Sequence, residues 1–295
     1  MEDLIPLAIQ AVAWLLMFVV GVELTPDDLR GVAARPRFVA GATIAQLVFL
    51  PMVAAGLVIA FQPDDRLAAG MILVAISPSG AISNAFALLA RANLALSVVL
   101  TAVSNLTSVA TMPVLAAVGF HWLLAKDAGI HAPMGPIFGQ LLLLMVMPIL
   151  LGFELCRRGP DLVERARPLL AKAALAGVFA LIALVLFDQW EMVKQVIGEV
   201  LIYAAMFTAL AMVGGYVVGV ALRADRRDRV TLMFELSSRN LAIVTVVAAQ
   251  ALGRLDVVVF AVAFFLVQAP LALAVAAVHR LVAPSISQRV ADRLP

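Results

Sequence analysis

The chain has 295 residues, of which 64% are hydrophobic and 14% charged, and its formal net charge is only +2. A soluble globular domain is closer to half apolar and a quarter charged, so this composition excludes that class of protein. The apolar residues form long blocks, each close to the roughly 20 residues that a membrane-spanning helix needs. The sequence therefore predicts an all-α polytopic membrane protein that lies in a lipid bilayer and has no nucleic-acid partner.

Apolar runs bounded by charges, prolines and glycines predict nine transmembrane helices. In chain order we expect them at about 4–24, 36–61, 66–91, 94–120, 136–156, 168–187, 195–222, 227–252 and 255–281. The first begins close to Met1, with Glu2 and Asp3 before it, so it is expected to be a retained span rather than a cleaved signal peptide. The longest polar segment, about 154–167, is expected to be a loop.

The basic residues predict the orientation of these spans. Sixteen of the 21 lysine and arginine residues fall in alternate loops and in the C-terminal tail. They are Arg30, Arg35, Arg37, Arg91, Arg157, Arg158, Arg165, Arg167, Lys172, Arg223, Arg226, Arg227, Arg229, Arg280, Arg289 and Arg293. The opposite side holds Arg66, Lys126, Lys194 and Arg254, and Arg239 alone lies within a span. This asymmetry predicts a multi-pass protein of the cell (inner or plasma) membrane, with its N-terminus outside and its C-terminus in the cytoplasm.

Two of the predicted helices are interrupted at their centres. The span 66–91 is broken by the polar and turn-forming run 77–84, and the span 227–252 is broken by the run 235–240. Breaks inside a bilayer free backbone groups that lipid cannot satisfy, so they survive only where protein or a wet cavity surrounds them. Two breaks in corresponding positions of two halves point to the binding site of a secondary transporter. The first broken helix enters from outside and the second from inside, so we expect an inverted repeat with the two breaks crossing near the midplane.

The residues at these breaks offer binding groups of both signs. Carbonyl ends of helices and carboxylates favour cations, whereas amide ends favour anions. An ionised Glu235 at mid-bilayer costs about 2.5–3.5 kcal/mol unless it is partnered, and a sodium site or Arg239 would partner it. Ser97 and Thr101 bring neutral oxygens to one face of the helix 94–120, and Gln46 lies mid-span in 36–61. The pattern predicts sites for a metal cation and for an organic anion.

Enzymatic function is not expected. The sequence has no nucleotide-binding loop, no zinc-type histidine pair and no nucleophile elbow. Its single cysteine, Cys156, cannot form an intrachain disulfide, and no cysteine or histidine spacing suggests a metal site. No cofactor is therefore predicted other than a possible sodium ion.

At the two breaks the chain resembles the bile acid:sodium symporter (BASS) family, in its bacterial form. The run Pro78-Ser79-Gly80-Ala81-Ile82-Ser83-Asn84 resembles the family's Pro-Gly-Gly-x-x-Ser-Asn break, and the run from Glu235 to Asn240 resembles its Glu-x-Gly-x-Gln-Asn break. The similarity extends from about residue 10 to residue 280. It implies a single transmembrane transporter domain over 1–295. Core helices would lie at about 36–120 and 195–281, and panel helices at about 4–24, 136–156 and 168–187.

The resemblance also implies a function and a set of site residues. The function would be alternating-access, sodium-driven uptake of small organic anions such as bile acids, pantoate or keto-acid-like carboxylates. Carried over by position, the first sodium site would be formed by Ser83, Asn84, Ser97, Thr101 and Glu235. The second would draw on Gln46, Glu235, Leu236, Ser238 and the residue at 239. The substrate cavity would include Ala81, Arg239, Asn240 and Gln268.

The chain departs from the family pattern at one of these ligands, because Arg239 stands where the family has a glutamine. A guanidinium is always charged and cannot ligate sodium, so coupling to one sodium, to protons through Glu235, or to nothing is expected. Arg239 could replace the second sodium, bind a substrate carboxylate, or form a structural clamp with Glu235. Two other functions stay open: a cation/proton exchanger that uses Glu235, and a membrane receptor that binds ligand without transporting it.

Overall fold

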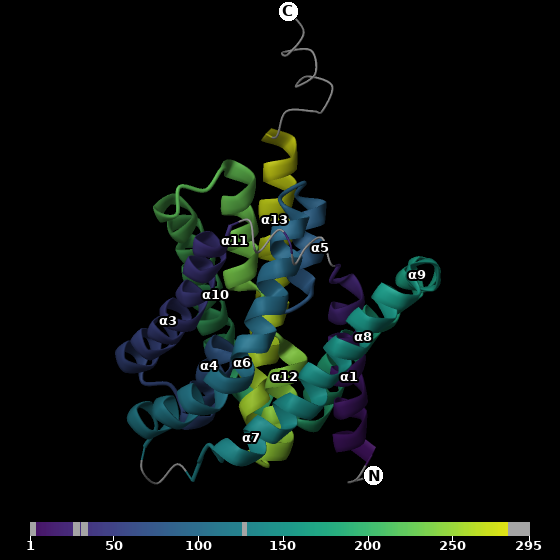
Figure 1. The fold of residues 1–295 in the computed structure, drawn as a ribbon. Coiled ribbons are helices and arrows are strands. Elements are labelled where there is room, and N and C mark those ends of the chain that lie inside the picture. Colours follow the sequence, from purple (N-terminus) through teal and green to yellow (C-terminus); the bar gives the residue numbers. More distant parts are fainter. Residues whose placement is uncertain (1–3, 26–29, 31–34, 126–128, 283–295) are drawn as a thin grey trace, which may run out of the picture.

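The computed structural model describes residues 4–25, 30, 35–125 and 129–282, and the regular elements in this part of the chain are helices (Figure 1). Its α-helices are α1 (Leu4–Glu23), α3 (Pro36–Phe61), α4 (Asp65–Ile76), α5 (Ile82–Leu89), α6 (Leu94–Leu123), α7 (Met134–Leu141), α8 (Met147–Arg158), α9 (Pro160–Asp188), α10 (Trp190–Ala221), α11 (Arg226–Ser237), α12 (Leu241–Val246) and α13 (Val258–Val282). Two π-helical turns, η1 (Leu142–Val146) and η2 (Val247–Ala251), and a 3₁₀ turn, η3 (Leu255–Val257), continue neighbouring helices. The prediction of an all-α protein is confirmed.

Six stretches of the described chain are long and apolar enough to cross a membrane. They are Pro36–Phe61, Leu94–Leu123, Met134–Arg158, Pro160–Asp188, Trp190–Ala221 and Leu255–Leu281. Each falls on one of the predicted spans. The other three predicted spans coincide with α1 and with the broken pairs α4–α5 and α11–α12, whose separate helices are shorter. Lys126, Arg289 and Arg293, which entered the predicted orientation, lie outside the described residues.

The predicted loop at 154–167 is wrong. Helix α8 continues to Arg158, α9 begins at Pro160, and only Gly159 separates them. Charged residues are tolerated in the last turn of α8 because Arg157 and Arg158 both pair with Glu154 one turn earlier. Pro160 suits the first turn of α9, where its missing N–H would have no helical partner. The polar residues of this segment therefore lie at the exposed junction between α8 and α9.

Helices α1, α8 and α9 pack together on one side of the molecule (Figure 1). The contact between α1 and α8 is a backbone contact made by two glycines. A Cβ on Gly21 would lie 2.1 Å from the carbonyl oxygen of Ile149, and one on Gly152 would lie 2.3 Å from that of Phe18. Such close approach through small residues is the usual way in which membrane helices associate, because lipid supplies no hydrophobic force between them.

The two broken helix pairs lie between this group and helices α3 and α10 (Figure 1). Helix α6 contacts α3, α4, α5 and α11, while α10 contacts α3, α11 and α13. Figure 1 shows α5 and α11 in one half of the molecule and α4 and α12 in the other. The chain therefore passes through the two breaks in opposite directions, and the breaks meet in the interior.

Candidate ion and substrate site

The two helix breaks are joined by backbone hydrogen bonds. The N–H of Gly80 donates to the carbonyl of Ser238, and the N–H of Asn240 donates to the carbonyl of Pro78, each at 3.0 Å. Ser79 and Arg239 thereby form an isolated antiparallel bridge. The backbone groups that the breaks release satisfy one another, as they must in a region without water.

This pairing explains why residue 80 is a glycine. A Cβ at residue 80 would lie 2.9 Å from the carbonyl oxygen of Arg239 and 3.2 Å from its carbonyl carbon. Backbone cannot yield as a flexible side chain can, so only glycine allows the two breaks to come this close.

Glu235, in the last turn of α11, is fully buried and its carboxylate is surrounded by hydroxyl groups. Ser97 Oγ donates to Oε1 at 2.6 Å, Ser79 Oγ donates to Oε2 at 2.9 Å, and Thr101 Oγ1 lies 3.3 Å from both oxygens. These donors come from α6 and from the first break. All are neutral, and no cationic side chain of the described residues contacts the carboxylate.

Ser83 and Asn84, in the first turn of α5, complete an oxygen cluster around this carboxylate. Ser83 Oγ lies 3.1 Å from Thr101 Oγ1 and 3.5 Å from Ser97 Oγ, and Asn84 Oδ1 lies 3.5 Å from Thr101 Oγ1. The structure thus brings together the five residues predicted for the first sodium site. A cluster of hydroxyl, amide and carboxylate oxygens suits a hard cation, and the described residues hold no group of three histidine, cysteine or acidic side chains.

The residues predicted for the second sodium site are less clearly assembled. Ser238 Oγ accepts a hydrogen bond from Gln268 Nε2 of α13 at 3.0 Å. Leu236 is fully buried. Gln46 of α3 is also buried, but neither its amide nitrogen nor its amide oxygen has a hydrogen-bond partner. The contacts therefore join Ser238 to a residue predicted for the substrate cavity and leave Gln46 apart.

Arg239, in the second break, is a buried charged residue with unpaired hydrogen-bond donors. It is only 5% exposed, and its Nε and Nη1 atoms have no hydrogen-bond partner. No hydrogen bond or salt bridge joins it to Glu235 among the described residues, so the two opposite charges interact only at longer range.

The other two residues predicted for the substrate cavity have local roles at helix starts. Asn240 caps α12, accepting a hydrogen bond from the N–H of Ile243 at 3.2 Å, and its Nδ2 lies 3.7 Å from Met17 Sδ of α1. Ala81 precedes α5 and is partly buried.

Two residues of the site were not predicted from the sequence. Ser79 stands where the family pattern has a glycine, and its hydroxyl donates a hydrogen bond to Glu235. Glu23, at the end of α1, accepts a hydrogen bond from Asn84 Nδ2 at 2.9 Å. An acidic residue inside the predicted span 4–24 was a signal that could have identified it, because such residues are rare in membrane helices.

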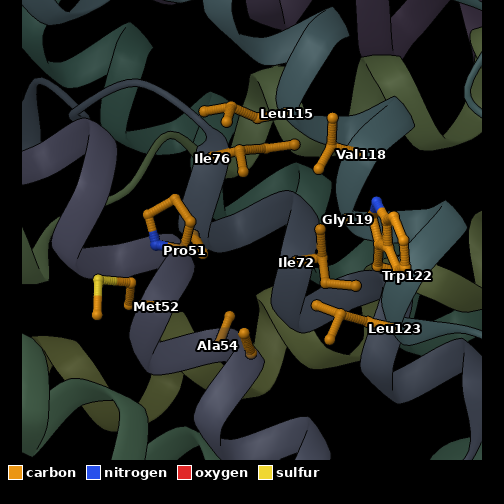
Figure 2. Close-up of a pocket in the computed structure, with 12 residues that line it drawn as sticks. Pro51, Met52, Ala54, Ile72, Ile76, Leu115, Val118, Gly119, Trp122 and Leu123 are labelled. Carbon is orange, nitrogen blue, oxygen red and sulfur yellow. The ribbon is translucent and has the colours of Figure 1, made fainter.

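A separate pocket of about 320 Å³ lies between α3, α4 and α6 (Figure 2). Its wall includes Pro51 and Met52 of α3, Ile72 and Ile76 of α4, and Trp122 of α6. The wall is almost wholly hydrocarbon, so it offers nothing to fix a carboxylate. None of the four residues predicted for the substrate cavity lines it.

The comparisons with known proteins agree on one family. The model of the Sodium Bile acid symporter family matches residues 12–196, which include the first break and end before the second. The chain is 27% identical over 228 residues to the uncharacterized sodium-dependent transporter YocS of Bacillus subtilis (strain 168), covering 77% of this chain and 68% of that protein. It is 26% identical over 238 residues to the probable sodium/metabolite cotransporter BASS1, chloroplastic, of Arabidopsis thaliana, covering 81% of this chain and 58% of that protein.

A third relative is the sodium-dependent organic anion transporter of Bos taurus, 27% identical over 164 residues. That alignment covers 55% of this chain and 42% of the bovine protein. The chain therefore spans less than two thirds of the plant and bovine relatives and slightly more than two thirds of the bacterial one.

Proposed function

The chain belongs to the sodium bile acid symporter family, and on that premise we propose that it is a secondary transporter that carries a small organic anion across a membrane with sodium. The observation that carries the proposal is the oxygen cluster of Ser83, Asn84, Ser97, Thr101 and Glu235 beside the paired breaks. A sodium ion there would neutralise the buried carboxylate. The names of two relatives, an uncharacterized sodium-dependent transporter and a probable sodium/metabolite cotransporter, support the same class of function.

The proposed architecture has nine spans in an inverted repeat. The six long apolar stretches, α1 and the two broken pairs would make up the nine. Helices α1, α7–α8 and α9 would form the panel, and the remaining helices the core, which would rock against the panel to expose the site to either side. The mutual packing of α1, α8 and α9 supports this division. The distribution of basic residues supports an N-terminus outside and a C-terminus in the cytoplasm.

The proposed coupling ion is a single sodium, because Arg239 would act as a fixed cation in place of the second. Its charge is permanent and it is buried near the second break. With an effective dielectric constant near 20, a sodium ion ~8 Å from this guanidinium would feel a repulsion of about 2 kcal/mol. A second sodium closer than that would be repelled more strongly. The first site, built on Glu235, would be weakened but retained.

The proposed substrate carries a carboxylate. A buried cation that lacks a counterion is strongly destabilising, and Arg239 Nε and Nη1 have no partner in the described residues. A guanidinium binds carboxylates through two parallel hydrogen bonds, so a substrate carboxylate would supply the countercharge and a partner for one of the unpaired donors. Asn240 and Gln268 would add neutral polar contacts nearby. Bile acids, pantoate and keto acids are all compatible with this arrangement.

Uptake into proteoliposomes tests the proposal. Labelled pantoate, pyruvate and taurocholate would each be offered with an inward sodium gradient, an inward proton gradient, and neither. Sodium-stimulated uptake of at least one anion is expected. Sodium/proton exchange without any anion would instead identify a cation/proton exchanger that uses Glu235. Anion binding without flux under any gradient would identify a receptor.

A further inference from the structure

Glu23 is a charged residue of the interior to which neither the family pattern nor the proposed function assigns a role. It is the last residue of α1, partly buried, and its Oε2 accepts a hydrogen bond from Asn84 Nδ2 at 2.9 Å. Asn84 belongs to α5 and to the oxygen cluster proposed for sodium. The contact therefore connects the proposed panel to the proposed cation site.

This hydrogen bond determines which end of the Asn84 amide faces the cation site. An ionised carboxylate can only accept hydrogen bonds, so the amide must turn its Nδ2 toward Glu23. Its Oδ1 then points the other way, where it lies 3.5 Å from Thr101 Oγ1. Thr101 in turn lies 3.3 Å from both carboxylate oxygens of Glu235. Without Glu23, the amide could present its NH₂ group to the site, and an NH₂ group cannot ligate a cation.

Glu23 also changes the balance of charge around the breaks. Arg239 carries a charge opposite to that of Glu235, so it weakens the attraction of Glu235 for a sodium ion. Glu23 adds a second carboxylate, so one monovalent cation makes the three buried or partly buried charges neutral. Among the described residues, Arg167 of α9 also interacts electrostatically with Glu23, but it is exposed and therefore screened by solvent.

The residue that follows Glu23 lies in an apolar environment. Leu24, the next residue, packs against Val98 and Ala102 of α6 and against Phe153 of α8. These side chains offer no alternative partner for either the carboxylate or the Asn84 amide. The hydrogen bond between Glu23 and Asn84 is a polar link between α1 and α5 within the described residues.

We propose that Glu23 is a positioning residue of the cation site, which holds Asn84 Oδ1 toward the ion and offsets the charge of Arg239. The inference rests on the proposed sodium coupling. It adds a residue of the panel to a site otherwise built from the core. When the panel and core move against each other, this contact must change, so occupancy of the cation site and the position of α1 are linked.

Binding of radioactive sodium to the purified protein tests this role without a known substrate. Glu23→Gln keeps the shape of the side chain, but its amide can donate as well as accept and carries no charge. Glu23→Ala removes the partner altogether. Both variants are expected to bind sodium at least about tenfold more weakly than the wild type, since a hydrogen bond to a charged group is lost. Glu199→Gln is the matched control, because Glu199 accepts a hydrogen bond from Tyr203 on α10 and lies outside the site.

Thermal unfolding separates positioning from a merely structural role. The proposal predicts that sodium raises the melting temperature of the wild type and of Glu199→Gln, and that this rise is strongly reduced in the Glu23 variants. A structural role would lower the melting temperature in sodium-free buffer and leave the sodium-induced rise intact, which would overturn the inference. Wild-type affinity in both Glu23 variants would also overturn it, while the proposed function would stand. Absence of sodium binding by the wild type would overturn both.

Discussion

Ser79 and Arg239 face each other in an isolated antiparallel bridge, although they belong to different broken helices. The bridge places the Ser79 hydroxyl 2.9 Å from the carboxylate of Glu235 and holds Arg239 in the same interior region. The backbone pairing of the two breaks therefore also positions a hydroxyl of the proposed ion site. A substitution that moves the two breaks apart is therefore expected to weaken cation binding as well.

Gly80→Ala is expected to separate the breaks. The added Cβ would lie 2.9 Å from the carbonyl oxygen of Arg239, and overpacking of this kind typically costs about 1–3 kcal/mol of stability. We expect a lower melting temperature in detergent and weaker sodium binding. Gly56→Ala in α3 is the control, since no atom lies within 4 Å of its Cβ position. Equal behaviour of the two variants would show that the close approach at Gly80 is unimportant.

Gly152→Ala is expected to loosen α8 from α1. Its Cβ would lie 2.3 Å from the carbonyl oxygen of Phe18, so the helices would have to move apart. The expected loss is again about 1–3 kcal/mol, measured as a decrease in melting temperature. Gly198→Ala, in the middle of a helix with open space around its Cβ, should leave stability unchanged or slightly raised. A stable Gly152→Ala protein would contradict the backbone contact.

Ser97→Ala is expected to weaken sodium binding by about tenfold or more, because its hydroxyl forms the shortest contact to Glu235, at 2.6 Å, and a hydrogen bond to a charged group contributes about 1.5–3 kcal/mol. Equilibrium binding of radioactive sodium measures the effect. Ser108→Ala is a closely matched control, since Ser108 is equally buried on the same helix but donates only to the carbonyl of Ser104. If both variants bind sodium like the wild type, Ser97 is not a ligand.

Arg239→Gln is expected to steepen the dependence of transport on sodium. Removing the fixed charge and restoring the family's glutamine should allow a second sodium to bind, raising the Hill coefficient for sodium from about one toward about two. Arg239→Lys retains a positive charge and should keep the shallow dependence. An unchanged sodium response in Arg239→Gln would rule out the replacement of a sodium ion by the guanidinium.

Much of the fold could be predicted because each membrane span is a local feature of the sequence. The apolar runs predicted the helices. Pro78 and Gly80 indicated a break, because proline has no N–H to continue the helical hydrogen bonds. The segment 154–167 was mistaken for a loop because polar composition cannot distinguish a loop from an exposed helical end. Pairing between Glu154 and its two arginine neighbours makes the helical form favourable there.

The candidate site could be predicted only in part, for a different reason. Ser97, Thr101 and Glu235 were expected because hydroxyls and a carboxylate inside spans need partners. The contacts of Ser79 with Glu235 and of Glu23 with Asn84 join distant parts of the chain, and no local pattern encodes them. Gln46 stays a predicted ligand of the second site, since it is buried and its amide has no hydrogen-bond partner among the described residues. Tertiary packing, rather than residue type, decides these pairings.

The most direct test of the account is the ratio of sodium to substrate carried in one transport cycle. Radioactive sodium flux and uptake of a labelled organic anion would be measured together in the same proteoliposomes, with Glu235→Gln as the inactive reference. The account predicts about one sodium ion per anion, because the fixed charge of Arg239 takes the place of a second sodium. Anion uptake without accompanying sodium, or with two sodium ions, would contradict it.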